Sequence, residues 1–199
     1  ASVTENFSNL NMFYAAFLEG EDSLTKYQRN GTTSLNLYLI GMPKFDKYYS
    51  GIKTTTLIKS VGICTNGMDD LDAFEQLVIK VKQTIPDLKI IIRPHPSDRR
   101  KDSWLNLATT YQCLFSDVKQ IESFKFFEET DLIISGDSNI HLEAALLNIP
   151  TIYYDPLKYG LDWYGFRKNG LVFYEENASE ICNYIRSVSV SMPKTRIKT

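Results

Sequence analysis

The sequence contains few cysteines and little net charge, and each shortage excludes a class of protein. Its three cysteines, Cys64, Cys113 and Cys182, are odd in number and show no CxxC spacing. The sequence therefore indicates neither a disulfide framework nor a zinc site, and this cysteine usage fits a reducing cytoplasm. A formal charge of -2 over 199 residues gives no electrostatic basis for binding nucleic acid.

Long apolar runs are also missing. No run approaches the roughly 20 residues that span a bilayer, and the first residues lack the basic and then apolar pattern of a leader. The content of hydrophobic residues, 43%, suffices for one good core. We therefore expect a soluble, cytoplasmic protein with one compact domain and some additions.

From residue 57 onward, the spacing of apolar residues alternates between that of strands and that of helices. The predicted strands are Leu57–Thr65, Leu88–Arg93, Cys113–Phe115, Asp131–Ser135, Thr151–Tyr154 and Leu171–Tyr174. The predicted helices are Asp69–Thr84, Asp102–Thr110, Glu122–Glu129, Ile140–Leu147 and Ala178–Val188. This alternation predicts an α/β fold, a Rossmann-like doubly wound parallel sheet with helices on both faces.

The ends of the chain do not follow this alternation. Residues 1–50 are interpreted as an N-terminal extension and interdomain-type linker, in which Asn11–Glu19 has the spacing of a helix and Leu35–Ile40 that of a strand. Residues 51–190 form the predicted nucleotide-sugar-binding domain. Residues 191–199 form a basic tail that we expect to fray.

Two predicted strands break off abruptly into polar residues. Ile91–Ile92 leads into Arg93–Pro96, and Ile133–Ile134 leads into Ser135–Asn139. In a buried parallel sheet such strand ends deliver side chains to the edge where ligands bind. The two segments therefore indicate one site.

The second segment has the pattern of a phosphate-binding loop. A strand, the polar loop Ser135–Asn139 and a helix together present backbone N–H groups at a helix N-terminus, where the helix dipole favours an anion. Glu143, one turn into the helix, could accept hydrogen bonds from a ribose. The alternatives are that Asp137, Ser138 or Asn139 only caps the helix, and that Glu143 is an ordinary solvated glutamate.

In the first segment, His95 lies between two prolines, which make the backbone stiff and extended. An imidazole at such a strand end is well placed to meet a ligand phosphate or a leaving group, although a histidine bonded to backbone in a rigid turn is the alternative. Arg93 could pair with a diphosphate or instead satisfy a neighbouring carboxylate or carbonyl. A metal held by His95, His141 and Asp137 is disfavoured, because nothing in their spacing is specific for metal.

An aromatic cluster follows the predicted strand Thr151–Tyr154. It could flank a base or a sugar, but core packing is the expected role of most of its members. The cluster comprises Tyr153, Tyr154, Tyr159, Trp163, Tyr164 and Phe166.

Two segments of the sequence together resemble a known family. Arg93–Pro96, followed about forty residues later by Ser138–Pro150, resembles the C-terminal half of bacterial capsule and teichoic-acid transferases of the GT-B type. This group includes the CDP-glycerol glycerophosphotransferases, the polysialyltransferases and the capsule Kdo transferases. Gly41–Asp46 is also similar to the G-x-P-x-x-D segment that joins the two halves of such enzymes.

The resemblance implies a GT-B half-domain that binds a CMP-, CDP- or UDP-linked donor without a further cofactor or metal. It implies that His95 approaches the donor phosphates and is catalytic, that Ser138 and Asn139 hold phosphate, and that Glu143 approaches the ribose. Together with Arg93 and Ser135 these are the predicted donor-binding residues.

Two features depart from the family pattern. Asn139 replaces a second serine that is usual in the glycerophosphotransferases, which leaves the donor open. The acceptor-binding half is missing from the sequence, so the expected partners are a nucleotide-sugar donor and an acceptor-binding domain or subunit. Peripheral membrane association through that partner is compatible with this interpretation.

Two other functions remain open. Sugar-nucleotide 2-epimerases have a comparable strand, loop and acidic helix, but their loop is glycine-rich after the serine, unlike Asn139-Ile140. A non-catalytic nucleotide-sugar-binding subunit of a split transferase is the second alternative.

Overall fold

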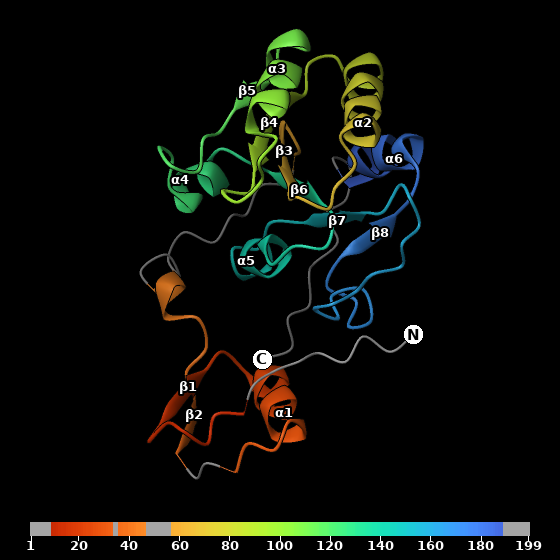
Figure 1. Ribbon diagram of the computed structural model, residues 1–199. Helices are drawn as coiled ribbons and strands as arrows, with labels where there is room; N and C mark the ends of the chain where they lie inside the picture. The colour runs from red at the N-terminus through yellow and green to blue at the C-terminus, as the bar shows by residue number, and fades with distance from the viewer. Residues whose placement is uncertain (1–8, 34–35, 47–56, 189–199) are drawn as a thin grey trace. The chain divides into compact units, whose positions relative to one another are not determined.

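The computed structural model describes residues 9–33, 36–46 and 57–188 (Figure 1). It divides the chain into two compact units, residues 1–50 and 51–199. The expected basic tail, residues 191–199, lies outside the described residues. Within the described ranges, no helix has the length and apolar character that crossing a bilayer requires.

The first unit contains the strand β1 (Ala16–Leu18), the helix α1 (Glu21–Arg29) and the strand β2 (Leu37–Leu39), which pairs with β1 in parallel. The helix predicted over Asn11–Glu19 is therefore wrong. Residues 11–14 form a turn instead, which is tied to residues about twenty positions later because the Asn11 carboxamide accepts from the Thr33 N–H and donates to the Gly31 carbonyl. These contacts override the helical spacing of its apolar residues.

The second unit is built on a six-stranded sheet in the order β5-β4-β3-β6-β7-β8, and all its neighbouring strands pair in parallel. This order is the doubly wound one, so the predicted fold class is confirmed. The strands are β3 (Ser60–Thr65), β4 (Lys89–Pro94), β5 (Leu114–Phe115), β6 (Leu132–Ser135), β7 (Thr151–Tyr154) and β8 (Phe173–Glu175).

Helices cover both faces of this sheet (Figure 1). The core on one face is formed by α2, α3 and α6 packing on alternate strand residues such as Ile63, Ile92 and Ile134. On the other face, Gly62 lies so close to Phe126 of α4 that a Cβ there would meet its ring at 2.5 Å. The helices are α2 (Leu71–Thr84), α3 (Lys101–Thr110), α4 (Ser123–Glu128), α5 (Ile140–Leu146) and α6 (Ala178–Val188).

The helix α2 shows how the sequence specifies these elements. Asp70 caps it by accepting a hydrogen bond from the Ala73 N–H at 2.8 Å, as Asp residues do at N-caps. Its apolar stripe, Phe74, Leu77, Val78 and Val81, is at most 1% exposed. Burial on this scale contributes about 1.5–3 kcal/mol per side chain, which is why the stripe fixes the helix against the sheet.

Candidate functional site

Three strand ends meet where the order of the sheet reverses. β3 lies between β4 and β6, and the chain leaves its two neighbours toward opposite edges of the sheet. The His95 N–H bonds to the Thr65 carbonyl at 2.7 Å, and the Asn66 carboxamide bonds to the Asp137 carbonyl at 3.3 Å. Crevices at such switch points are the ligand sites of open α/β sheets.

His95 is exposed at this edge. Its Nδ1 accepts a hydrogen bond from the Ser97 N–H at 3.2 Å and lies 2.6 Å from the Ser97 hydroxyl oxygen. A neutral ring held in this way carries its proton on Nε2. The Nε2–H group is not occupied by any described residue, so it can donate to a ligand.

His95 lines a hollow of about 250 Å³ including its open side, which we call the His95 hollow. Its other lining residues include Asp98, Lys101, Asp117 and Lys119. Lys101 pairs with Asp117 at 2.7 Å. Both cationic and anionic side chains therefore line the His95 hollow.

Arg93 lies on β4, and its guanidinium bonds within the protein and does not line this hollow. The side chain is buried, and its Nη1 and Nη2 donate to the Ser116 hydroxyl at 2.6 Å and to the Ile121 carbonyl at 3.0 Å. Burial lowers the pKa of Arg93, while the charge of Glu143 nearby raises it. Both terminal nitrogens, which were expected to bind a diphosphate, thus donate hydrogen bonds within the protein.

Ser135 is likewise engaged. Its hydroxyl is fully buried and donates to the Cys64 carbonyl at 2.7 Å, which ties the end of β6 to β3. Cys64 is buried too, and burial raises the pKa of its thiol to about 12. Both residues hold the strand ends in register at the switch point.

The predicted phosphate loop is half-buried between β6 and α5. The Ser138 hydroxyl accepts from the Ile140 N–H at 3.4 Å, a long hydrogen bond, and Asn139 begins α5 without a side-chain cap. Capping therefore accounts for little of what these side chains do. The charge of Glu143, one turn later, influences both Arg93 and Cys64, so the two predicted segments come together around β3.

His141 supports this loop from within the protein. It is 1% exposed, its Nε2 lies 2.9 Å from the Gly136 carbonyl, and its ring stacks on Tyr153. Burial lowers its pKa to about 4, so the ring is neutral and donates from Nε2 to the carbonyl. Among the described residues no group of three or more His, Cys, Asp or Glu side chains could hold a metal ion.

Asp69 is a residue of the site that the sequence interpretation missed. The sequence predicts a helix that begins at Asp69, but α2 begins at Leu71, and the Asp69 Oδ2 accepts from the Asn66 N–H at 2.7 Å. A Cβ on Gly136 would lie 2.1 Å from its Oδ1, so only glycine lets the carboxyl approach the loop. Burial raises the pKa of Asp69 to about 7. The signal that could have found it is Gly136 itself, a glycine directly after a buried strand.

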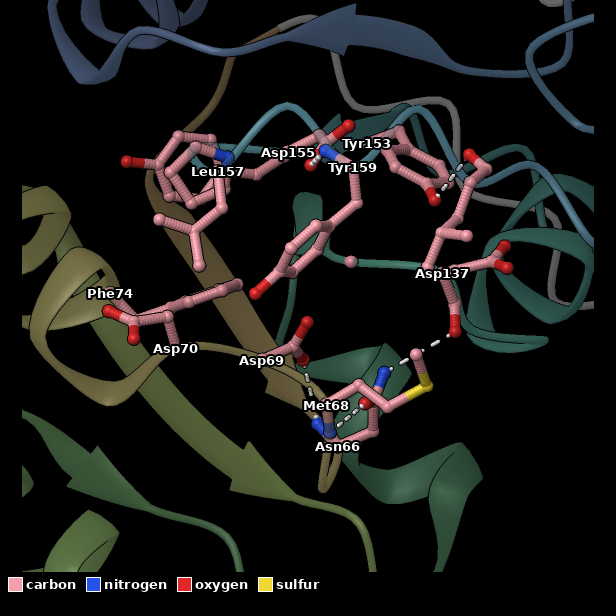
Figure 2. A pocket seen from close by; sticks show the side chains of 14 residues that line it. Asn66, Met68, Asp69, Asp70, Phe74, Asp137, Tyr153, Asp155, Leu157 and Tyr159 are labelled. Atoms are coloured by element: carbon pink, nitrogen blue, oxygen red, sulfur yellow. Dashed lines mark hydrogen bonds between the residues drawn. The ribbon is translucent and has the colours of Figure 1, made fainter. Parts of the chain in front are cut away.

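Asp69 lines a second hollow, of about 430 Å³ including its open side, which we call the Asp69 hollow (Figure 2). It is formed by residues at the ends of β3, β6 and β7. Tyr153 and Tyr154 of the aromatic cluster line it and are buried, while Tyr159 lines it and is 62% exposed. Asp155 fixes the loop after β7 by accepting from the Tyr159 and Gly160 N–H groups.

Comparison with known proteins identifies what this arrangement resembles. No protein-family model matches the chain. A curated relative, the teichoic acid glycerol-phosphate primase of Staphylococcus aureus, is 26% identical over 140 residues, which cover 64% of this chain and 34% of the relative. The chain resembles teichoic-acid transferases. It spans about a third of the length of this relative.

Solved structures show the same fold. The wall teichoic acid polymerase TagF with CDPG has a TM-score of 0.52 at 15% identity, over 90% of this chain and 50% of its own. TarM has a TM-score of 0.51 at 15% identity, over 92% of this chain and 38% of its own. UDP-N-acetylglucosamine 2-epimerase from Rickettsia bellii has a TM-score of 0.58 at 14% identity, over 93% and 53%. The second unit therefore has the fold of one GT-B half.

Proposed function

We propose that the chain is the donor-binding half of a glycosyl- or glycerophosphotransferase that uses a nucleotide-activated donor in surface-polysaccharide synthesis. The observation that carries the proposal is the meeting of the His95 strand end and the Ser138 loop on either side of β3. Because neighbouring strands are about 4.8 Å apart, β4 and β6 are separated by roughly 10 Å, a span that suits a diphosphate. The similarity to the glycerol-phosphate primase supports the same class of donor.

In the proposed mechanism, an acceptor hydroxyl attacks the group to be transferred and gives its proton to a base of the acceptor-binding half, while the bond between that group and the nucleotide phosphate breaks. The leaving phosphate gains negative charge as this bond breaks. His95, donating from Nε2, and the Ser138–Asn139 segment stabilise this charge, while Glu143 accepts hydrogen bonds from the ribose. Arg93 and Ser135 act by positioning, since their side chains already bond within the protein.

Transfer also needs an acceptor-binding half, supplied by the same polypeptide or by a second one. In this proposal the donor occupies the crevice at the switch point, and the acceptor approaches from that other half. If the chain is instead a non-catalytic binding subunit, it will bind nucleotide sugars yet contribute no group to turnover. In that case His95→Ala in the completed enzyme would leave the rate constant of transfer unchanged.

Calorimetry with CMP, CDP and UDP tests the site. His95→Ala and Ser138→Ala should weaken binding of the preferred nucleotide by about tenfold or more, because each removes a hydrogen bond to a charged phosphate, worth about 1.5–3 kcal/mol. Both side chains lie outside the core, so the melting temperature should change little. Ser103→Ala, an exposed position on α3, is the matched control and should bind like wild type. Equal binding by wild type and both variants would overturn the assignment.

A second candidate is a sugar-nucleotide 2-epimerase. The observation behind it is the shared fold with the Rickettsia bellii epimerase, at a TM-score of 0.58 over 93% of this chain. An epimerase needs no acceptor. Incubation with UDP-N-acetylglucosamine alone, followed by analysis of the sugar released from the nucleotide, separates the two functions: epimerised product supports the second candidate.

A further inference from the structure

The two hollows at the sheet edge differ in charge. The charged residues that line the Asp69 hollow are all aspartates: Asp69, Asp70, Asp137 and Asp155. No lysine, arginine or histidine of the described residues lines it. The His95 hollow, at the ends of β4 and β5, includes Lys101 and Lys119 beside its own acids. The Asp69 hollow, which β7 helps to form, is therefore the more negatively charged of the two.

The titration of Tyr153, on the wall of the Asp69 hollow, reflects this negative field. Burial raises the pKa of its hydroxyl most, and the charges that raise it further come from Asp137, Asp155, Asp162 and Asp69. The aspartates around the hollow thus give it a negative potential.

The walls of the Asp69 hollow also offer apolar surface. Figure 2 shows the Asp69 carboxyl and the Tyr159 ring directed into the space, with Leu157 and Phe74 beside them. Carboxyl oxygens accept hydrogen bonds from hydroxyl groups, and aromatic rings pack on the C–H faces of carbohydrates. Such a wall suits a small polyol or a sugar, whereas its aspartates would repel an anion.

We propose that the Asp69 hollow receives the transferred group of the donor and selects an uncharged or cationic, hydroxyl-bearing group against a carboxylate-bearing sugar. The inference rests on the proposed function, because the phosphates are assigned to the adjoining loop, whose residues Gly136 and Asp137 also line the hollow. Of the transferases that the sequence resembles, it favours those that transfer glycerol or neutral sugars over those that transfer sialic acid or Kdo.

UDP-glucose and UDP-glucuronic acid form a matched pair of probes, because they differ only in the replacement of a hydroxymethyl group by a carboxylate. Their CDP counterparts serve if cytidine nucleotides bind more tightly. At pH 8 the whole wild-type chain should bind the glucose compound roughly tenfold more tightly, measured by calorimetry. Asp69→Asn should reduce this ratio, and Asp72→Asn, an exposed aspartate on α2, should leave it unchanged.

The outcomes separate the two proposals. Equal or tighter binding of the glucuronic acid compound, with UDP or CDP alone still bound, would overturn the charge selection and leave the nucleotide site intact. Failure to bind any nucleotide would overturn the proposed function and this inference with it. The wild-type comparison needs no variant, so it decides the matter even if Asp69→Asn fails to fold.

Discussion

At the scale of single residues, the closest approach in the site is between Gly136 and Asp69. We expect Gly136→Ala to destabilise the second unit by about 1–3 kcal/mol, because the new methyl group must displace a carboxyl that Asn66 holds. Gly67→Ala is the matched control, since a Cβ at Gly67 meets nothing within 4 Å. Urea unfolding followed by tryptophan fluorescence measures both changes.

A double-mutant cycle shows whether the Asp69 carboxyl causes this loss. Asp69→Ala in the Gly136→Ala background should recover part of the lost stability, because it removes the atoms that the methyl group meets. Additive effects of the two substitutions would contradict the close contact. Reduced backbone entropy of the unfolded chain would make Gly67→Ala neutral or slightly stabilising, so a loss equal to that in Gly136→Ala would contradict the role of the contact with Asp69.

Single-residue roles were only partly predictable from the sequence. His95 lies exposed at the strand end, as its flanking prolines indicated. Arg93 and Ser135 occur in the same motifs, yet their hydrogen bonds go to Ser116 and Cys64, partners that become neighbours only in the folded sheet. Long-range contacts of this kind leave no local pattern, which is why their binding roles could not be distinguished from structural ones.

At the scale of elements, the alternation of strand and helix was predictable throughout the second unit. Isoleucine-rich strands buried on both faces, such as β4, differ clearly from stripes such as that of α2. The first unit was predicted less well, since β1 forms only through pairing with β2, about twenty residues later. The helix α1 has acidic residues in its first turn and basic residues in its last, a charge pattern that favours a helix at this position.

Arg93 gives a prediction about how the elements are joined. Its guanidinium links β4 to the segment between β5 and α4, so Arg93→Lys should cost roughly 2 kcal/mol in urea unfolding because lysine cannot form both bonds. Arg99→Lys, at an exposed neighbouring position, should be neutral. If Arg93→Lys left stability unchanged and weakened nucleotide binding, Arg93 would bind the donor instead.

At the scale of the whole molecule, the order of the six strands places every predicted site segment at one edge of the sheet. Right-handed crossovers made this arrangement predictable, since consecutive parallel strands joined by helices have few allowed orders. The negative charge of the Asp69 hollow was not predictable, because its aspartates follow three different strands. Only the sheet brings them around one space.

Two buried groups of the site, Asp69 and His141, make the stability of the folded state depend on pH in opposite directions. Asp69 has a folded-state pKa of about 7, raised from 3.8, with Arg100, Asp98 and Asp137 as its charged neighbours. The folded state therefore keeps this proton more tightly, and the stability it contributes is lost as the pH rises from about 4 to 7. His141, whose pKa is lowered from 6.5 to about 4, has the opposite effect, since stability rises with pH over nearly the same range.

In wild type these two contributions to the change of stability with pH oppose each other. Asp69→Asn removes the contribution of Asp69 and leaves that of His141. The stability of Asp69→Asn minus that of wild type should increase by up to about 1.4 kcal/mol per pH unit between pH 4 and 7 and then level off. Urea unfolding at half-unit steps of pH, followed by the fluorescence of Trp104 and Trp163 in the second unit, measures this difference. Asp72→Asn should give a flat difference. A flat difference for Asp69→Asn as well would mean that Asp69 is ionised at neutral pH and that water reaches its carboxyl.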